Sequence, residues 1–396
     1  MNALLNEICG KYTIPQETKA AGIYPYYKPI SSGQDPIVKM ADGSSVMMFG
    51  SNSYLGLSDD PRLKEAAIKA IEKYGTSCSG SRFLNGTLDI HEELEEKLAR
   101  FVGKDQAVTF STGFQVNLGV ISALGFRGGY ILLDDTDHAC IIDGSRLSWS
   151  TVYKFKHNDM DALEKKLKAC EPDAPKMIVV DGVYSMLGDL CPLPQICELA
   201  KKYNASVMVD DAHGLGVFGK NGSGTADYFG LTDKVDLIMG TFSKSFGSLG
   251  GFIAGSKPVI NYLKHNARSL IFSASMTPAA VAAASKALDI MQSEPERIEH
   301  LWDITRYAHA KFRENGFDIN ATQSPIIPLM VRDTRKAMQI VTLAYNEGVF
   351  ITPVIAPAVP EKDVLIRFAL MATHTKEHID IAVEKLTKIF KQLDVI

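Results

Sequence analysis

Between Gln106 and Gly255, short apolar segments alternate with stretches of helical pattern, and this alternation most limits the possible folds. The segments are apolar at consecutive positions rather than at every second one, which is typical of strands buried on both faces. Such strands, when separated by helices, build a mostly parallel sheet covered by helices. We expect strands at residues 107–110, 130–133, 177–180, 207–209, 235–239 and 251–254. The sequence therefore predicts an α/β fold.

The segment before this region predicts an N-terminal arm. Apolar runs at 37–40 and 46–49 flank Asp42 and Gly43, which is a hairpin signal. A lone hairpin is rarely stable, so we expect it to pack on the body of the protein or on a partner subunit. The chain has 396 residues and is 46% hydrophobic, which is enough for a large core and a smaller second domain.

The segment after the sheet region has long helical patterns and few strands, which indicates an α+β domain. We expect helices at residues 278–294, 295–315 and 376–393 and strands at 326–331 and 364–368. The predicted domains are an N-terminal arm and hairpin (1–58), a large α/β domain (59–295) and a small C-terminal α+β domain (296–396).

Composition excludes several classes of function. With 42 basic and 46 acidic residues the net charge is −4 and no basic block is present, which argues against nucleic acid as a partner. No apolar run approaches the roughly 20 residues of a membrane span, and no export signal is apparent. The six cysteines form no metal-ligand pattern and are typical of reduced thiols. We expect a cytoplasmic enzyme without a metal; contact with a membrane surface stays compatible with the sequence.

Lys244 stands in a loop of hydroxyl residues and glycines, residues 240–247, directly after an expected strand. A lysine there can form a Schiff base with an aldehyde cofactor, and Thr241 and Ser243 can hydrogen-bond a phosphate. A pyridoxal-phosphate (PLP) enzyme needs these groups. By itself, the segment is equally compatible with a surface lysine in a polar loop.

Polar residues also follow other expected strands, at the edge where open α/β sheets bind ligands. Residues 111–117 follow the first strand and open a helix, whose N-terminus can hold a phosphate. Asp210 and His213 follow the strand at 207–209; a carboxylate there can keep a pyridine nitrogen protonated, and the histidine can bond the ring's 3-oxygen. For either residue alone, a helix cap or a structural histidine is the simpler interpretation. The pair, upstream of Lys244, favours a functional role.

Two further residues have chemistry that calls for a ligand or a partner. His138 follows the strand at 130–133 and could stack on a flat ring, although without the neighbouring residues a histidine at a helix entry is the better interpretation. Arg367 lies within an apolar strand of the expected small domain. A buried arginine requires a carboxylate, which either the protein or a substrate would supply.

With these residues assembled, the chain resembles the α-oxoamine synthases, which are fold-type I PLP enzymes of the aspartate-aminotransferase-like fold with a large sheet of seven-stranded type. The resemblance runs from about Tyr24 to Val395. Its motifs are residues 51–57, 80–83, 137–144, 210–213 and 241–244. Members of the family join an amino acid to an acyl-CoA thioester with loss of CO₂.

Within the family the chain is most similar to the branch that condenses L-serine with palmitoyl-CoA to give 3-ketodihydrosphingosine. Residues 240–245 and 273–278 fit that branch, and so does the loop 356–360, with Val359 where threonine is usual. The sister branch, the 2-amino-3-ketobutyrate CoA ligases, joins glycine to acetyl-CoA and shares most other motifs. That ligase, or another short-chain α-oxoamine synthase, is the alternative.

The resemblance implies a role for each matching residue. Lys244 holds PLP as a Schiff base and then acts as general base or acid at the substrate Cα. His138 stacks on the pyridine ring and steers the substrate carboxylate, and Asp210 pairs with the ring nitrogen. The implied partners of the 3-oxygen are His213 and Ser185. The implied phosphate ligands are Thr112, Gly113, Phe114, Thr241 and Ser243.

The same resemblance implies the substrate contacts and the assembly. Asn52, Arg367 and Ser81 would bind the amino acid, the first two through its carboxylate. Ser273 would reach the cofactor phosphate of the neighbouring subunit, which requires a homodimer with active sites at its interface. A non-catalytic subunit on the same fold and an ordinary aminotransferase are the remaining hypotheses. Lys244 argues against the first, and the second would use a 2-oxo acid instead of CoA.

Overall fold

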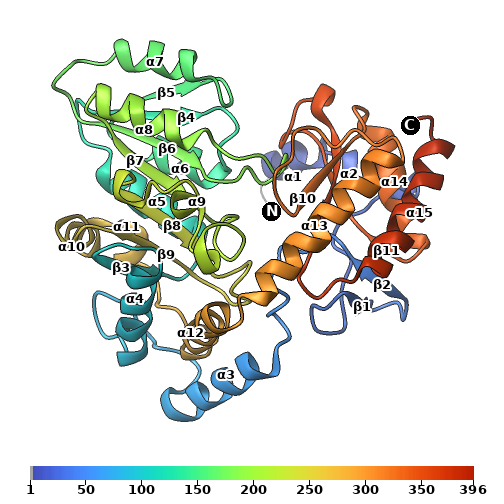
Figure 1. The fold of residues 1–396 in the computed structure, drawn as a ribbon, viewed down its shortest axis with the longest axis horizontal. Helices are drawn as coiled ribbons and strands as arrows, with labels where there is room; N and C mark the ends of the chain where they lie inside the picture. Colours follow the sequence, from blue (N-terminus) through green and yellow to red (C-terminus); the bar gives the residue numbers. More distant parts are fainter. Residues whose placement is uncertain (1–2) are drawn as a thin grey trace.

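The computed structural model describes residues 3–396 and contains a large sheet domain and a smaller domain, with α13 (Glu296–Glu314) running between them (Figure 1). The large sheet has seven strands in the order β3-β9-β8-β7-β6-β4-β5, and β9 alone runs antiparallel to its neighbours. The strands are β3 (Gln106–Phe110), β4 (Tyr130–Asp134), β5 (Thr151–Phe155), β6 (Lys176–Asp181), β7 (Ser206–Asp210), β8 (Leu237–Thr241) and β9 (Gly251–Gly255). The predicted α/β fold is confirmed.

Helices cover both faces of this sheet because its strands are apolar on both faces. Leu132 and Leu133, which are neighbours on β4, belong to two separate buried clusters. One cluster joins the sheet to α5 (Gly113–Leu124), α6 (Ala139–Arg146), α10 (Lys257–Asn266) and α11 (Arg268–Ile271). The other joins it to α3 (Pro61–Tyr74), α4 (Asp89–Phe101), α7 (Met160–Lys168), α8 (Leu193–Lys202), α9 (Thr225–Tyr228) and α12 (Pro278–Ser293).

The smaller domain is α+β, as predicted. Its antiparallel sheet has the order β10-β13-β12 and is packed with α13, α14 (Thr334–Asn346) and α15 (Lys376–Gln392). The three strands are β10 (Ile326–Met330), β12 (Thr352–Val354) and β13 (Leu365–Ala369). Short 3-10 turns occupy Lys220–Gly222, Thr232–Lys234 and Glu361–Asp363.

The predicted hairpin is confirmed as β1 (Ile37–Lys39) and β2 (Ser45–Met48). It packs on the body, because β2 pairs in parallel with β11 (Val349–Phe350) from the smaller domain. Residues far apart in the sequence thus share one small sheet. The proposed domain boundaries at 58/59 and 295/296 stay a prediction.

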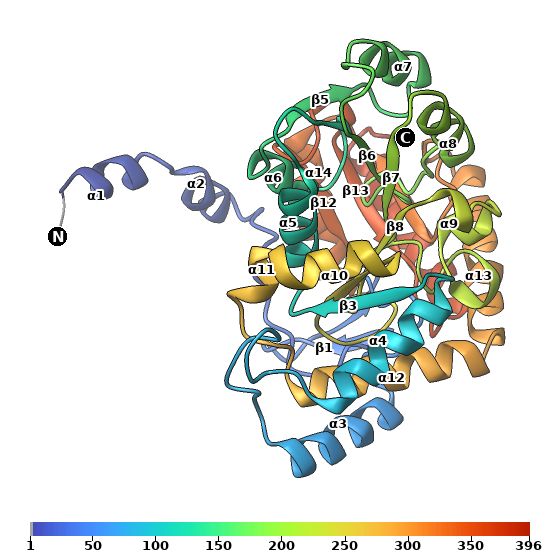
Figure 2. The same ribbon diagram turned by 90° about the vertical axis from the view of Figure 1, so that its left-hand side faces the viewer.

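The first two helices lie apart from the body. No residue of α1 (Ala3–Gly10) or α2 (Ile14–Ala20) is buried, and Figure 2 shows both helices extending away from the rest of the chain. Their side chains include the exposed Leu5, Ile8 and Ile14. Across residues 3–396, no helix combines the length and apolarity needed to cross a bilayer.

Candidate active site

The polar residues expected at the carboxyl ends of the strands do surround one cavity. Its volume is about 250 Å³. The residues of the sequence prediction that line it are Thr112, Gly113, Phe114, His138, Asp210, His213, Thr241, Ser243 and Lys244. They come from the last residues of β7 and β8 and from the segments that follow β3, β4, β7 and β8. A parallel sheet brings these strand ends to one edge, so residues more than a hundred positions apart meet there.

Lys244 is half-buried in a well-packed segment that follows β8. Phe242 and Phe246 on either side are fully buried, with ring centroids 5.2 Å apart, and Ser245 donates a hydrogen bond to the Leu215 carbonyl at 2.7 Å. Burial lowers the pKa of Lys244 to about 8, although the nearby carboxylates favour its charged form. About a tenth of the amine is therefore unprotonated and nucleophilic at pH 7, far more than for a lysine at its usual pKa of about 10.4.

Asp210 is the last residue of β7 and is buried at the cavity wall. Each of its two carboxylate oxygens accepts a hydrogen bond from another group of the protein. Asn117 donates to one oxygen at 2.6 Å, and the backbone N–H of Ala212 donates to the other at 3.0 Å. The next carboxylate, Asp211, accepts two hydrogen bonds from Thr225, at 2.7 and 2.9 Å, and its burial raises its pKa to about 7. Asp210 thus lines the cavity while Asp211 supports the loop.

A phosphate fits at the N-terminus of α5. Thr112 caps this helix by accepting the N–H of Gln115 at 3.1 Å, and the first turn of a helix leaves backbone N–H groups for an anion. Gly113 has to be glycine here, because a Cβ would lie 2.8 Å from the Thr241 hydroxyl oxygen. The hydroxyls of Thr241 and Ser243 lie 3.0 Å apart beside it. The absence of a side chain at Gly113 keeps this cradle open.

His138 is held with a defined tautomer. Its Nδ1 accepts the backbone N–H of Cys140 at 3.2 Å, and the Cys140 thiol lies 2.8 Å from the same nitrogen. Because Nδ1 is an acceptor, the ring proton resides on Nε2. Burial lowers the pKa of His138, so the ring is neutral. His138 therefore offers a neutral face and one N–H donor.

Arg367, on β13, is the contribution of the smaller domain to the site. Its Nη2 donates to Asn52 Oδ1 at 2.8 Å and to the Tyr54 hydroxyl at 3.1 Å. Tyr54 in turn lies 2.6 Å from Nδ1 of His213, whose pKa burial lowers well below its usual value. No carboxylate among residues 3–396 forms a salt bridge with Arg367. The guanidinium can thus receive a carboxylate from a ligand.

Five predicted residues lie outside the lining of the cavity: Asn52 and Arg367, which contact each other beside it, and Ser81, Ser185 and Ser273. Ser185 accepts the Arg367 Nε hydrogen bond with its backbone carbonyl at 2.7 Å. The Ser273 hydroxyl accepts a hydrogen bond from the Gln115 side chain at 3.2 Å, next to the phosphate cradle. Ser81 is buried, and within residues 3–396 its hydroxyl has no hydrogen-bond partner. Their roles toward cofactor and substrate stay predictions.

The sequence interpretation assigned no individual role to several residues that shape the site. Asn117 and Asp181 support or line the cavity, and Tyr54 links Arg367 to His213. Asn117 could have been found as the buried polar residue of an apolar helix. Asp181 could have been found as an acidic residue that ends a continuously buried strand.

The chain belongs to the aminotransferase class I and II family, whose model matches residues 44–386. Curated relatives named serine palmitoyltransferase are 61% identical in Bacteroides thetaiotaomicron (99% of this chain, 100% of the relative) and 58% identical in Sphingobacterium spiritivorum (99% and 98%). An 8-amino-7-oxononanoate synthase of Lysinibacillus sphaericus is 43% identical over 96% of this chain and 98% of its own length.

The fold comparison agrees with these relatives. A serine palmitoyltransferase from S. paucimobilis, solved with a bound PLP–myriocin aldimine, superposes with a TM-score of 0.96 at 33% identity. The superposition covers 99% of this chain and 100% of that one. The expected fold-type I class and the expected family are thereby confirmed.

Proposed function

We propose that this chain is a PLP-dependent acyltransferase that condenses L-serine with a long-chain acyl-CoA, palmitoyl-CoA, to 3-ketodihydrosphingosine, CoA and CO₂. The observation that carries this proposal is one cavity that combines the Lys244 amine, of lowered pKa, with the Asp210 carboxylate. The Arg367 guanidinium lies close by and can bind a carboxylate of the substrate. The full-length likeness to serine palmitoyltransferases supports the proposal and the choice of substrates.

The residues present fit the proposed cofactor. The Lys244 amine would hold its aldehyde carbon, and Asp210 would hold a proton on its ring nitrogen. The N-terminus of α5 with Thr241 and Ser243 would hold its phosphate, in the cradle that a Cβ at Gly113 would fill. When bound, PLP supplies an electron sink for the carbanion that forms at the amino-acid Cα.

The protein's own groups then move the proton and orient the substrate. Lys244, with a pKa of about 8, can take a proton from Cα and later return one close to neutral pH. Arg367 binds the carboxylate of L-serine and is itself oriented by Asn52 and the Ser185 carbonyl. His138 donates from Nε2, so it can bond an oxygen of the substrate without contributing charge.

We further propose a homodimer with active sites at the interface, in the cytoplasm. Leu84 and Phe272 are 77% and 72% exposed. They lie on segments joined by hydrogen bonds of Ser275 to the carbonyls of Gly80 and Gly86. Apolar side chains this exposed next to the predicted Ser273 contact fit a subunit interface. All six cysteines are free thiols, which agrees with a reducing compartment.

The test is to incubate the purified protein with L-serine and palmitoyl-CoA and to follow CoA release and the long-chain 3-keto amine by mass spectrometry. The proposal expects both products, and palmitoyl-CoA to be used better than acetyl-CoA. If glycine with acetyl-CoA is turned over far better, the short-chain alternative replaces it. Sedimentation equilibrium should give a dimer that Phe272→Glu weakens; a wild-type monomer with full activity would overturn the shared site.

A further inference from the structure

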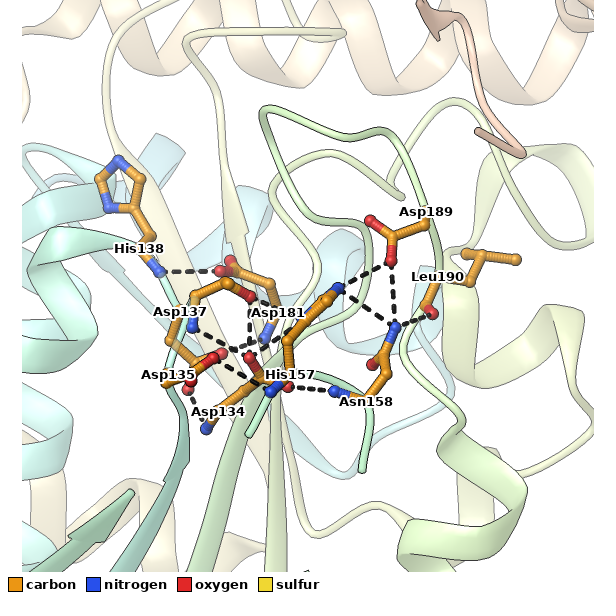
Figure 3. A network of polar contacts seen from close by, with 10 residues as sticks. Asp134, Asp135, Asp137, His138, His157, Asn158, Asp181, Asp189 and Leu190 are labelled. Atoms are coloured by element: carbon orange, nitrogen blue, oxygen red, sulfur yellow. Dashed lines mark hydrogen bonds and ion pairs between the residues drawn. The ribbon is translucent and has the colours of Figure 1, made fainter. Parts of the chain in front are cut away.

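His157 follows β5 and lies between two carboxylates, one at the end of β4 and one in the loop after β6 (Figure 3). Its Nδ1 is 3.0 Å from an oxygen of Asp134, and its Nε2 is 2.8 Å from an oxygen of Asp189. The hydroxyl of Thr136 lies 2.7 Å from Nδ1 and shares that hydrogen bond. A neutral imidazole would turn a lone pair toward one carboxylate, whereas the charged ring donates to both. The contacts therefore favour the charged ring.

The electrostatics agree with these contacts. Burial lowers the pKa of His157, but the hydrogen bonds and charges of Asp134 and Asp189 outweigh burial and raise it to about 10. The ring also stands edge-on to Tyr184, with centroids 4.4 Å apart. Asp134 is fully buried, so without this cation a carboxylate would remain in the interior with no positive partner. His157 and the two carboxylates are best described as one ion triad.

The first arm of the triad leads to His138. Asp134 ends β4, and its carboxylate accepts the N–H groups of Thr136 and Asn158 at 2.9 Å each, which shapes the turn before His138. Within that turn Asp137 accepts the N–H of Asp134 at 2.9 Å and that of Asp181 at 3.1 Å. Asp181 then accepts the backbone N–H of His138 at 2.8 Å. A chain of hydrogen bonds thus connects His157 to the backbone of the stacking histidine (Figure 3).

The second arm leads to Arg367. Asp189 lies in the loop 183–190 after β6, which closes on itself through the Val183–Leu190 bridge and a 3.0 Å hydrogen bond from the Tyr184 N–H to the Asp189 carbonyl. The same loop presents the Ser185 carbonyl that accepts Nε of Arg367 at 2.7 Å. Displacing Asp189 would therefore displace the acceptor that orients this arginine.

We propose that His157 is a positioning residue that ties the turn carrying His138 to the loop carrying Ser185, and so sets where His138 and Arg367 stand around the cavity. It touches neither substrate nor cofactor. This inference rests on the proposed function, because it takes His138 as the group that stacks on the cofactor and Arg367 as the group that binds the substrate carboxylate. His157 would hold both in position. The substrate that should sense a change at His157 is the amino acid, whose carboxylate both residues approach, rather than the acyl-CoA.

The experiment compares His157→Gln with His309→Gln. Glutamine at 157 removes the charge and keeps a single donor group. His309 is a matched control, since it is a half-buried histidine on α13 whose side chain makes one hydrogen bond within residues 3–396, to the Ser324 carbonyl at 3.1 Å, and it belongs to neither arm. L-Serine binding is measured by the absorbance change of the PLP-loaded protein, and steady-state kinetics give KM for palmitoyl-CoA. Amide hydrogen exchange is followed at residues 134–138 and 183–190 with and without cofactor.

For His157→Gln we expect the serine Kd to rise about ten-fold, with the KM for palmitoyl-CoA changed less than about two-fold. Exchange should accelerate in both segments, in the cofactor-free protein as well. His309→Gln should leave the serine Kd within about two-fold even if it lowers the melting temperature equally. Equal serine Kd values for the two variants, or faster exchange in one segment only, would overturn the proposal.

Asp189→Asn keeps the test decisive if His157→Gln does not fold. It retains the hydrogen-bonding shape of the side chain and removes one charge of the triad, so the same two segments should loosen and serine should bind more weakly. An unchanged serine Kd and unchanged exchange in this variant would equally refute the role. Failure of the proposed function gives a different result, since the wild-type protein would then show no absorbance change with L-serine.

Discussion

Two cavities lie at opposite edges of the large sheet, and they differ more in chemistry than their sizes suggest. The larger, of about 590 Å³, lies at the amino ends of the strands and is lined by Lys104, Lys176 and Tyr262 among others. The smaller, of about 250 Å³, lies at the carboxyl ends and contains Lys244. Both cavities therefore contain lysine. Choosing the active site by volume alone would select the cavity at the amino ends of the strands, which is not the one that contains Lys244.

The difference lies in what the lysine amines contact. Lys104 donates to the carbonyls of Thr232 and Val235, and Lys176 donates to two further carbonyls at 2.6 and 2.9 Å. Burial lowers the pKa of Lys104 too, but its amine is occupied by backbone acceptors. Within residues 3–396 no hydrogen bond occupies the Lys244 amine, and it faces Asp210 across the cavity. A reactive lysine needs a lowered pKa together with a free lone pair.

The largest expected effect is that of Lys244→Ala. Removing the nucleophile and proton carrier should lower product formation by about 10³-fold or more, because no other group in the cavity can replace it. CoA release from L-serine and palmitoyl-CoA is the assay. Retention of more than a tenth of the wild-type rate would mean that the reactive amine has been misassigned.

Arg367→Lys should come next. The planar guanidinium holds Asn52, Tyr54 and the Ser185 carbonyl while it faces the substrate, and a point charge cannot keep that geometry. We expect the KM for serine to rise about 10²-fold, with a smaller change in the KM for palmitoyl-CoA. Equal increases in both KM values would argue that Arg367 acts on the fold and not on the amino acid.

The pH dependence of the free amine gives an intermediate effect. In the cofactor-free protein the rate at which Lys244 reacts with added PLP should rise with pH and level off above a midpoint near 8, since only the neutral amine attacks. Stopped-flow absorbance measures this rate. Asp210→Asn should move the midpoint down, because Asp210 favours the charged amine. A wild-type midpoint near 10.5 would contradict the buried environment described for Lys244.

Lys104→Met should have the smallest effect on catalysis and complete the comparison. It leaves carbonyl acceptors without their donor, so the free energy of unfolding should fall by about 1–2 kcal/mol while kcat and KM stay within about two-fold. Urea unfolding and the CoA assay measure the two quantities. A large loss of activity without loss of stability would give the amino-edge cavity a function of its own.

Much of the fold follows from local pattern, and the exceptions have a physical reason. Continuously apolar strands such as β6 and β8 were predicted because they are buried on both faces. β5 was missed because this edge strand, unlike β3 at the other edge, keeps Thr151 and Lys154 exposed, which breaks the apolar run. The pairing of β2 with β11 joins residues some 300 positions apart, and no local pattern reveals such a contact.

The site was predictable where a residue type has few other uses. Lys244 follows β8 and Asp210 ends β7. An amine and a carboxylate at these positions have a clear use in binding a cofactor and little use in a loop that only connects elements. Tyr54 and His157 were missed because their roles depend on what faces them, respectively Arg367 with His213 and a pair of carboxylates. Sequence spacing places a residue at an edge of the sheet, but it does not state which side chain it will meet there.

The central claim is that the carboxyl-edge cavity holds the cofactor through Lys244. The most direct measurement is to load the protein with PLP, reduce it with borohydride, digest it and locate the pyridoxyl group by mass spectrometry. The account predicts one modified peptide, with the group on Lys244. A group found on Lys104 or Lys176 instead, or no stable modification at all, would contradict it.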